Sequence, residues 1–259
     1  MTRFEGRTAV VTGGAGGIGS AVCHRLAAEG AAGGVLDRDH DAARAVADAI
    51  NAGGAGAGGR AGAFCCDITR RDEVEAALAG VTEALGPVDV LINNAGFDIF
   101  KPFLATEPSE WERLIAVNLV GALTMHHLVL PGMVERGYGR IVNVASDAAR
   151  VGSTGEAVYA ACKAALLGLT KTLAREHARH GITLNVVCPG PTDTALFEEF
   201  RRGAGNPDKL MDSFRRAIPL GRIGRPDDLP GAIGFLASDD AAYVTGQVIS
   251  VSGGLSMAG

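Results

Sequence analysis

Cysteine is scarce in this sequence of 259 residues, and no two cysteines form a CxxC pair. The five are Cys23, Cys65, Cys66, Cys162 and Cys188. An odd number at irregular spacings argues against a disulfide framework and against a zinc site built on paired thiolates. We expect reduced thiols that pack mostly as small, buried hydrophobic side chains.

The sequence also lacks long runs of basic residues and long runs of apolar residues. Lysine and arginine form no extended basic run and the formal net charge is −5, which disfavours a nucleic-acid-binding surface. No apolar run approaches the roughly 20 residues of a membrane span. Residues 1–7 lead directly into an apolar run and a glycine turn, which leaves no room for a secretory signal. We therefore expect a cytoplasmic protein that binds neither nucleic acid nor a membrane.

Hydrophobic residues make up 47% of the chain and charged residues 20%, which suits one large domain over residues 1–259. Seven short apolar runs alternate with helical patterns and are predicted as strands: 8–11, 34–36, 63–65, 88–92, 140–144, 183–187 and 247–251. Continuously apolar strands are typical of a parallel sheet that helices cover on both faces. The predicted fold is therefore α/β, a doubly wound Rossmann sheet.

Two segments between these runs have unusual compositions. Residues 51–63 are too rich in glycine to hold a helix, so we expect the loose end of the second helix and a surface connector. Residues 193–217 carry phenylalanines on two helical patterns that a break at 203–207 separates. This pattern predicts either a small lid over the carboxyl ends of the strands or an ordinary helical hairpin on a sheet face.

A glycine cluster joins the first predicted strand to the first predicted helix at residues 12–19. At such a junction glycines let the backbone approach a pyrophosphate, which the helix N-terminus attracts. Asp37 ends the second strand about 20 residues later, where a carboxylate usually receives the adenosine ribose hydroxyls. It would repel a 2′-phosphate, so NAD is predicted over NADP. Arg38 complicates the choice because it could pair with that phosphate, and a capping or turn role for Asp37 is the alternative.

Small and polar residues follow the next two strands. Asp67 and Ile68 come after the third strand, and Asn94 lies in the segment 93–96 after the fourth. The carboxyl ends of parallel strands line the ligand crevice, so the first pair could hold the adenine edge and the second segment could border the cofactor. Without the glycine cluster, either would indicate only a turn.

Tyr159 and Lys163 are four residues apart, which places them on one face of a helix. A fixed cation beside a phenol favours the phenolate and lowers the phenol's pKa from about 10 toward neutrality. Tyr159 would then donate and accept a proton at working pH. Taken alone, a half-buried tyrosine beside a solvated lysine is the commoner arrangement.

Several motifs together resemble the short-chain dehydrogenase/reductase family in order and spacing, over essentially the whole chain. They are residues 12–19, 93–96, Asn118, Ser146, 159–163 and 189–190. The resemblance implies a one-domain, seven-stranded Rossmann fold, a nicotinamide cofactor and a homotetramer.

The same resemblance assigns roles to individual residues. It implies that Tyr159 is the catalytic acid and base, and that Lys163 lowers the pKa of Tyr159 and binds the nicotinamide ribose. Ser146 would hold the substrate oxygen and Asn118 would anchor a proton-relaying water. The implied cofactor contacts are Gly13, Ala15, Gly16, Ile18, Asp37, Asp67, Ile68, Asn94, Tyr159, Lys163, Thr192 and Thr194. Two positions depart from the family pattern, Cys162 and Glu156, and we expect the Glu156 carboxylate to be solvated.

Segments 97–103, 146–152 and 189–194 are further similar to family members that oxidise a cyclic 2-hydroxyacyl-CoA. That likeness implies oxidation of a ring alcohol, β to a CoA thioester, to the 2-oxo thioester with reduction of NAD. Basic side chains within 193–217 could meet the CoA phosphates, although a solvated helix face is the alternative. They are Arg201, Arg202, Lys209, Arg215 and Arg216.

Three other functions remain open: a 3-oxoacyl thioester reductase, a dehydrogenase of a simple cyclic alcohol or steroid, and a cofactor-binding regulator without catalysis. Asp37 disfavours the first, since biosynthetic reductases commonly use NADP. No metal site is predicted, because His177 and His180 have no third ligand in register and the adjacent His126 and His127 point to different sides of a helix.

Overall fold

Seven parallel strands form one sheet in the order β3-β2-β1-β4-β5-β6-β7 in the computed structural model, which describes residues 2–53, 59–203 and 205–257. The sheet therefore confirms all seven predicted strands. Their bounds are β1 Thr8–Thr12, β2 Ala32–Asp37, β3 Arg60–Cys65, β4 Val88–Asn93, β5 Gly139–Val144, β6 Ile182–Pro189 and β7 Val248–Val251.

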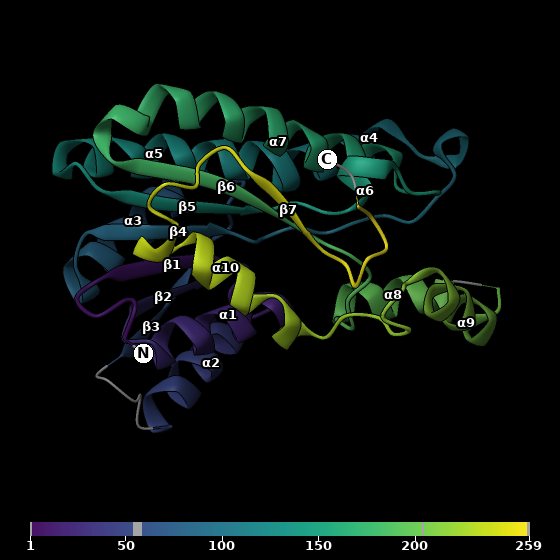
Figure 1. Ribbon diagram of the computed structural model, residues 1–259, viewed down its shortest axis with the longest axis horizontal. Coiled ribbons are helices and arrows are strands. Elements are labelled where there is room, and N and C mark those ends of the chain that lie inside the picture. The colour runs from purple at the N-terminus through teal and green to yellow at the C-terminus, as the bar shows by residue number, and fades with distance from the viewer. Residues whose placement is uncertain (1, 54–58, 204, 258–259) are drawn as a thin grey trace.

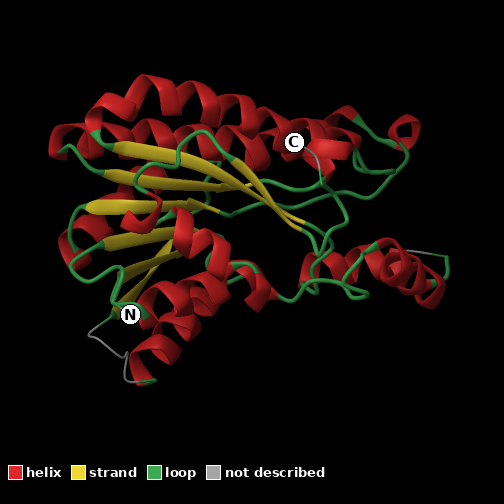
Figure 2. Cartoon of the chain, in the orientation of Figure 1, coloured by secondary structure: helices red, strands yellow, loops and turns green. Residues whose placement is uncertain are grey.

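Helices cover both faces of this sheet (Figures 1 and 2). One face carries α1 (Gly17–Ala28), α2 (His40–Ala52) and α10 (Pro230–Leu236), and the other carries α3 (Arg71–Leu85), α5 (Gly121–Arg136) and α7 (Ala157–His177). Val10 and Leu91 pack toward the α3, α5 and α7 layer, whereas Val11 and Ile92 pack toward the other. Burial on both faces is the reason that these strands are apolar at every position.

The sheet reverses its winding direction between β1 and β4, which are neighbours in space although two strands separate them in sequence. A crevice opens at such a switch point, at the carboxyl ends of the strands. Thr12 links the two ends there, because its Oγ1 accepts hydrogen bonds from the backbone N–H groups of Asn94 (3.0 Å) and Ala95 (3.1 Å).

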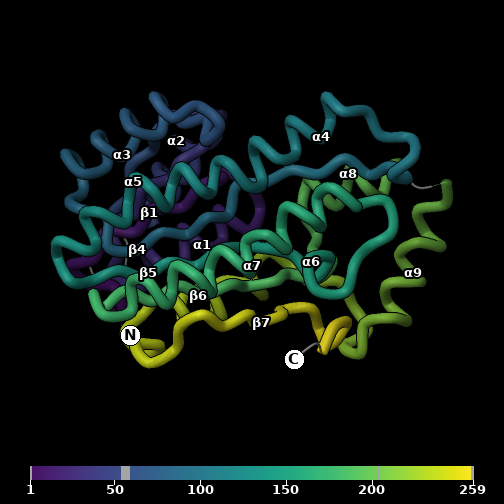
Figure 3. The backbone as a smooth tube through the Cα atoms, turned by 90° about the horizontal axis from the view of Figure 1, so that it is seen from above, coloured from purple at the N-terminus to yellow at the C-terminus, as the bar shows by residue number. Residues whose placement is uncertain are grey.

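The hairpin of α8 (Ala195–Gly203) and α9 (Pro207–Ala217) extends beyond the carboxyl ends of the strands rather than lying on a sheet face (Figures 1 and 3). Two further short helices lie toward the same end, α4 (Pro108–Ile115) and α6 (Ala148–Val151). The predicted break between the two lid helices is present, and Asn206 begins the second of them by accepting a hydrogen bond from the Lys209 N–H at 2.9 Å.

The glycine-rich connector is shorter than predicted. The second helix ends at Ala52, residues 54–58 lie outside the described residues, and β3 already begins at Arg60. Pairing with β2 forms this strand, and the Asn51 side chain adds two hydrogen bonds to the backbone of Ala61. Tertiary pairing therefore overrides the weak strand propensity of alanine and glycine.

Two helical segments are long and apolar enough to span a membrane by length and composition alone, although neither contains an uninterrupted apolar run of about 20 residues. The helical segments Pro108–Arg136 and Ala157–His180 have mean hydropathies of 1.6 and 1.2 over their most apolar 18 residues. Both lie against the sheet, through α5 and α7. Helices that cover a buried sheet have the same length and composition, so the two segments are weak evidence for a membrane.

Candidate active site

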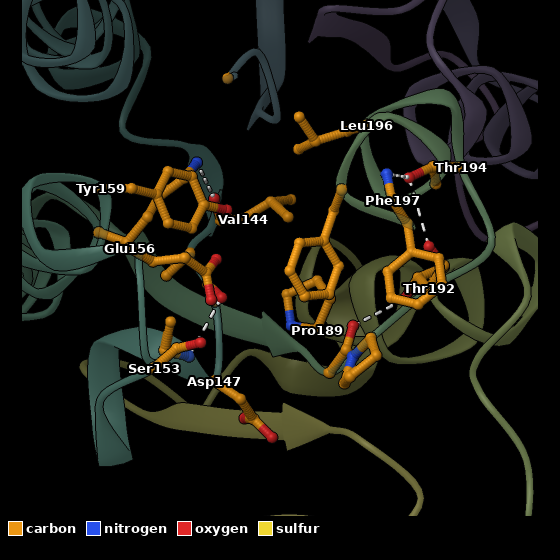
Figure 4. A pocket seen from close by; sticks show the side chains of 18 of the residues that line it. Val144, Asp147, Ser153, Glu156, Tyr159, Pro189, Thr192, Thr194, Leu196 and Phe197 are labelled. Carbon is orange, nitrogen blue, oxygen red and sulfur yellow. Dashed lines mark hydrogen bonds between the residues drawn. The ribbon is translucent and has the colours of Figure 1, made fainter. Parts of the chain in front are cut away.

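A cavity of about 250 Å³ opens at the carboxyl ends of the strands (Figure 4). Seven of the predicted site residues line it, from five different parts of the chain: Ile18, Asn94, Ser146, Tyr159, Lys163, Thr192 and Thr194. Gly96 of the segment 93–96 lines it as well. Residues far apart in sequence thus meet at one site, as the switch point predicts.

Tyr159 and Lys163 lie on the same face of α7, as their spacing predicts. The Lys163 side chain is only 3% exposed, and its Nζ donates a hydrogen bond to the Val144 carbonyl at 2.9 Å. The same Nζ lies 5.7 Å from the centroid of the Tyr159 ring. Ser146 follows β5 directly and is a hydrogen-bond partner of the Tyr159 phenol. A hydroxyl, a phenol and an ammonium group therefore converge on one wall of the cavity.

The electrostatics of this group differ from the prediction. Burial raises the pKa of Tyr159, the carboxyls of Asp98 and Glu156 raise it further, and the Ser146 hydrogen bond lowers it. Burial also lowers the pKa of Lys163 to about 8. The expectation that the lysine brings the phenol near neutrality is therefore wrong for the chain by itself, because burial and the two carboxyls dominate the pKa of the phenol. The phenol holds its proton at neutral pH.

Glu156 is half-buried and lines the cavity, so the expectation that it is solvated is also wrong. Figure 4 shows its carboxylate beside Tyr159. Glu156 precedes the first residue of α7, which brings its carboxylate to the cavity wall one helical turn before the phenol. The sequence spacing indicated this proximity but could not indicate its burial.

Asn118 lies in a π-helical turn, Ala116–Val120, between α4 and α5. Its Nδ2 donates to the carbonyls of Phe97 (2.9 Å) and Leu114 (3.0 Å), and its Oδ1 accepts from the Phe97 N–H at 3.3 Å. A Cβ on Gly96 would lie 2.7 Å from this Oδ1 and 3.0 Å from Lys163 Nζ. The side chains of Asn118 and Lys163 therefore both lie against Gly96. That Asn118 anchors a water that relays protons stays a prediction.

The glycine cluster has the geometry of a cradle for an anion. Gly13 has a φ of 62°, and a Cβ there would lie 2.9 Å from the Cα of Ala95. A Cβ on Gly19 would lie 2.1 Å from the Gly13 carbonyl oxygen. Gly16 caps α1 without a side chain, and no acidic residue lies in the first turn of that helix. The residues present therefore fit a pyrophosphate bound at the helix N-terminus.

Asp37 is joined to this cradle. Its Oδ2 accepts a hydrogen bond from the Ala15 N–H and its Oδ1 from the Asp39 N–H, both at 3.1 Å. The carboxylate is half-buried whereas Arg38 beside it is exposed. The structure thus places the predicted ribose acceptor next to the predicted pyrophosphate loop, and it also shows Asp37 in the turn role that the sequence left open.

The structure does not bring every predicted residue to the cavity wall. Asp67 Oδ1 accepts hydrogen bonds from the N–H and hydroxyl of Thr69, the pattern of a local turn. Ile68 is buried against Gly121, where a Cβ would approach it to 2.5 Å. Seven predicted residues lie outside the residues that line the cavity: Gly13, Ala15, Gly16, Asp37, Asp67, Ile68 and Asn118.

Thr194 connects the α8–α9 hairpin to the glycine cluster. Its Oγ1 accepts a hydrogen bond from the Phe197 N–H at 3.3 Å and donates one to the Thr192 carbonyl at 3.3 Å. Its Cγ2 lies 3.2 Å from the position of a Cβ on Gly17. The base of the hairpin therefore adjoins the cofactor cradle.

Four phenylalanine rings form the outer wall of the cavity, and we call them the aromatic wall. Phe100 follows β4 and lies 4.2 Å, centroid to centroid, from Phe200 of α8. Phe197 of α8 lies 5.7 Å from Phe214 of α9. All four line the cavity. Neither Phe100 nor the neighbouring Asp98 was predicted as a site residue, although both come within seven residues of the fourth strand's end.

Comparison with known proteins agrees with this architecture. A family model described as enoyl-(acyl carrier protein) reductase matches residues 13–256. An acetoacetyl-CoA reductase of Allochromatium vinosum is 38% identical and covers 97% of this chain and 99% of its own. A 3-oxoacyl-(acyl carrier protein) reductase of Thermotoga maritima is 36% identical, covering 98% and 99%. A 2,3-dihydroxy-2,3-dihydro-p-cumate dehydrogenase of Pseudomonas putida is 37% identical, covering 98% and 96%.

Solved structures also match this chain over nearly its whole length. The crystal structure of levodione reductase superposes with a TM-score of 0.91 at 32% identity, covering 97% of this chain and 98% of its own. A short-chain dehydrogenase/reductase from Mycobacterium marinum superposes with a TM-score of 0.90 at 33% identity, covering 98% and 97%. This chain belongs to the short-chain dehydrogenase/reductase family. It is an oxidoreductase that interconverts secondary alcohols and ketones with a nicotinamide dinucleotide.

Replacing Tyr159 with phenylalanine removes the phenolic proton without emptying the buried space. We expect turnover to fall by about 10² to 10⁴, the usual range for a lost general acid or base, while cofactor affinity changes little. Steady-state kinetics and fluorescence titration with NADH would measure both. Tyr243→Phe is the control because Tyr243 is fully exposed. Near-normal turnover in the Tyr159 variant would remove the phenol from the chemistry.

Proposed function

We propose that the protein is an NAD-dependent dehydrogenase of a cyclic 2-hydroxyacyl-CoA, with 2-hydroxycyclohexanecarboxyl-CoA as the substrate. The observation that carries this proposal is the aromatic wall opposite the catalytic groups. Phe100, Phe197, Phe200 and Phe214 offer an apolar surface to a ring, while Ser146 and Tyr159 offer hydrogen bonds to a single oxygen. Such a cavity suits an alicyclic secondary alcohol.

The chain's own residues supply the proton chemistry of this reaction. Ser146 holds the alcohol oxygen, Tyr159 accepts the hydroxyl proton during oxidation and returns it during reduction, and Lys163 with Asn118 keeps the phenol in place. An oxidised nicotinamide bound in this cavity would supply the hydride acceptor, and its positive charge would favour the phenolate. The raised pKa of the phenol in the chain alone suits the proton donor of the reverse reaction.

NAD is the proposed coenzyme because of Asp37. Its carboxylate lies at the end of β2 and holds the Ala15 N–H of the glycine loop, so a 2′-phosphate on the adenosine ribose would meet a fixed negative charge. Arg38 is exposed beside it and is the residue through which NADP could still be accepted.

The relatives support a thioester substrate by their names, which include acetoacetyl-CoA and 3-oxoacyl-(acyl carrier protein) reductases. These names also favour the second candidate, a 3-oxoacyl thioester reductase. In both candidate substrates the reacting oxygen is bonded to the carbon β to the thioester carbonyl. The ring distinguishes them, and the aromatic wall favours the cyclic substrate.

We further propose that the α8–α9 hairpin is a substrate lid whose basic side chains meet the CoA phosphates. Part of this charge is already paired within each helix, since Arg201 and Arg202 contact Glu198 and Arg215 contacts Asp212. The two arginines share one carboxylate and lie in the last turn of α8, beyond Glu198 and Glu199. Positive charge therefore gathers at the end of the helix, although α8 as a whole carries no net charge.

A homotetramer in the cytoplasm is the proposed assembly. Helices α5 and α7 border a second cavity of about 440 Å³, which is lined by four leucines, Pro131, Val134 and three histidines; the leucines are Leu123, Leu130, Leu169 and Leu173. An apolar surface of this kind suits contact with another copy of the chain. We expect sedimentation velocity to show a tetramer, and Leu123→Glu to shift it toward smaller species. A monomeric wild type would contradict this assembly.

A panel of substrates with both coenzymes tests the proposed reaction. We expect kcat/KM to be highest for 2-hydroxycyclohexanecarboxyl-CoA with NAD, lower for acyclic 3-hydroxyacyl-CoA esters, and lower again with NADP. Absorbance of the reduced coenzyme measures all of these. Preference for 3-hydroxybutyryl-CoA with NADP would favour the reductase, and activity only on alcohols without a thioester would exclude both thioester candidates.

Charge reversal of the lid tests CoA docking separately. In the variant Arg201→Glu/Arg202→Glu we expect KM for the CoA thioester to rise by about tenfold or more, because two phosphate partners become repulsive. KM for the ethyl ester of the same hydroxy acid should stay constant, since that ester carries no phosphate. Unchanged KM for the thioester would show that this surface does not bind CoA.

A further inference from the structure

Glu156 lines the cavity and Asp98 lies beside Glu156, although the proton chemistry of the reaction uses neither carboxyl group. Asp98 follows β4 and is 8% exposed, and Glu156 comes just before α7 and lines the cavity. The two segments are joined by a hydrogen bond from the Lys101 N–H to the Gly155 carbonyl at 3.0 Å. Figure 4 shows Glu156 pointing toward the open space beside Tyr159.

The carboxyls interact with each other. Asp98 Oδ1 accepts a hydrogen bond from the Ile99 N–H at 2.7 Å, whereas the buried Oδ2 has no well-oriented partner in the described part of the chain. Burial and the neighbouring Glu156 carboxyl raise the pKa of Asp98 to about 8. One proton held between the two groups would give Oδ2 the hydrogen bond it lacks. At neutral pH Asp98 therefore holds its proton and faces the Glu156 carboxyl group.

The cavity offers little to balance a second negative charge. Lys163 is the one basic residue among those that line it, and its ammonium group is buried and bound to the Val144 carbonyl. The other charged lining residues are Asp147 and Glu156, and the aromatic wall is apolar. An anionic group on the reacting part of a substrate would lose its hydration without gaining a partner.

We propose that Asp98 and Glu156 form a charge filter that rejects hydroxy acids with a free carboxylate and admits their neutral thioesters. This inference rests on the proposed function, because 2-hydroxycyclohexanecarboxylate carries its carboxylate on the ring carbon next to the reacting alcohol carbon. In the thioester that charge is removed, and the phosphates of CoA lie far from the pair. Asp98 and Glu156 are thus specificity-determining residues, and Asp98 acts through Glu156.

The test compares a neutral and an anionic alcohol that both lack CoA. The probes are ethyl 2-hydroxycyclohexanecarboxylate and the free 2-hydroxycyclohexanecarboxylate, and the readout is the ratio of their kcat/KM values. We expect the variant Asp98→Asn/Glu156→Gln to lower this ester-to-acid ratio by roughly 10- to 100-fold, because the repulsion between like charges in a shielded site is removed. Any change in the reactivity of Tyr159 affects both probes and cancels in the ratio.

Two further variants keep the experiment decisive. Glu156→Gln alone should give an intermediate fall in the ratio, and it serves if the double variant does not fold. Glu112→Gln is the matched control, since Glu112 is exposed on α4 and does not line the cavity. The ratio should not change in this control. An unchanged ratio in both pocket variants would overturn the charge filter.

Failure of the proposed function would be distinguishable from failure of the filter. If the wild type oxidises neither the cyclic ester nor its CoA thioester, the cyclic substrate is wrong. The same ratio is then measured with ethyl 3-hydroxybutyrate and 3-hydroxybutyrate. If kcat/KM for the CoA thioester is no higher than for the ethyl ester, the CoA-docking proposal is wrong. The charge filter is still tested in that case by the ester-to-acid ratio.

Discussion

The site depends on one constraint, the parallel register of β1 and β4 at the point where the sheet changes direction. Thr12 Oγ1 ties the two strand ends together by accepting hydrogen bonds from Asn94 and Ala95. The Asn94 side chain reinforces the link, since its Nδ2 donates to the carbonyls of Thr12 and Gly13 at 3.1 Å. The glycine cluster and the segment after β4 are therefore held as one unit, and the cofactor cradle and the catalytic cavity keep a fixed relation.

Desolvation sets the chemistry of the groups that this scaffold brings together. Burial raises the pKa of Tyr159 and of Asp98 and lowers that of Lys163, so each group moves toward its neutral form. A positively charged nicotinamide ring bound beside these groups would favour the phenolate. The carboxyls of Asp98 and Glu156 act in the opposite direction, because they raise the pKa of the phenol. The two groups proposed to select the charge of the substrate therefore also influence the reactivity of the catalytic acid.

Prediction from the sequence succeeded where one short segment carries the whole signal. The spacing of Tyr159 and Lys163 determines that they share a helix face, and the apolar runs determine the seven strands. It failed where burial or pairing decided the outcome. Glu156 was expected in solvent, and β3 begins at Arg60 inside a segment expected to be a connector. Neither the depth of a side chain nor the partner of a strand is a local property.

The amino-acid sequence by itself determined the fold class, the position of the glycine cluster and the helix face that Tyr159 and Lys163 share, because each follows from periodicity, turn chemistry or fixed helical spacing. Only the tertiary structure decided that Phe100 meets Phe200 across the cavity and that Asp98 meets Glu156 beside the phenol. Those contacts join segments more than 50 residues apart. They exist because strand order, which no local pattern encodes, brings the ends of β4, β5 and β6 to one edge.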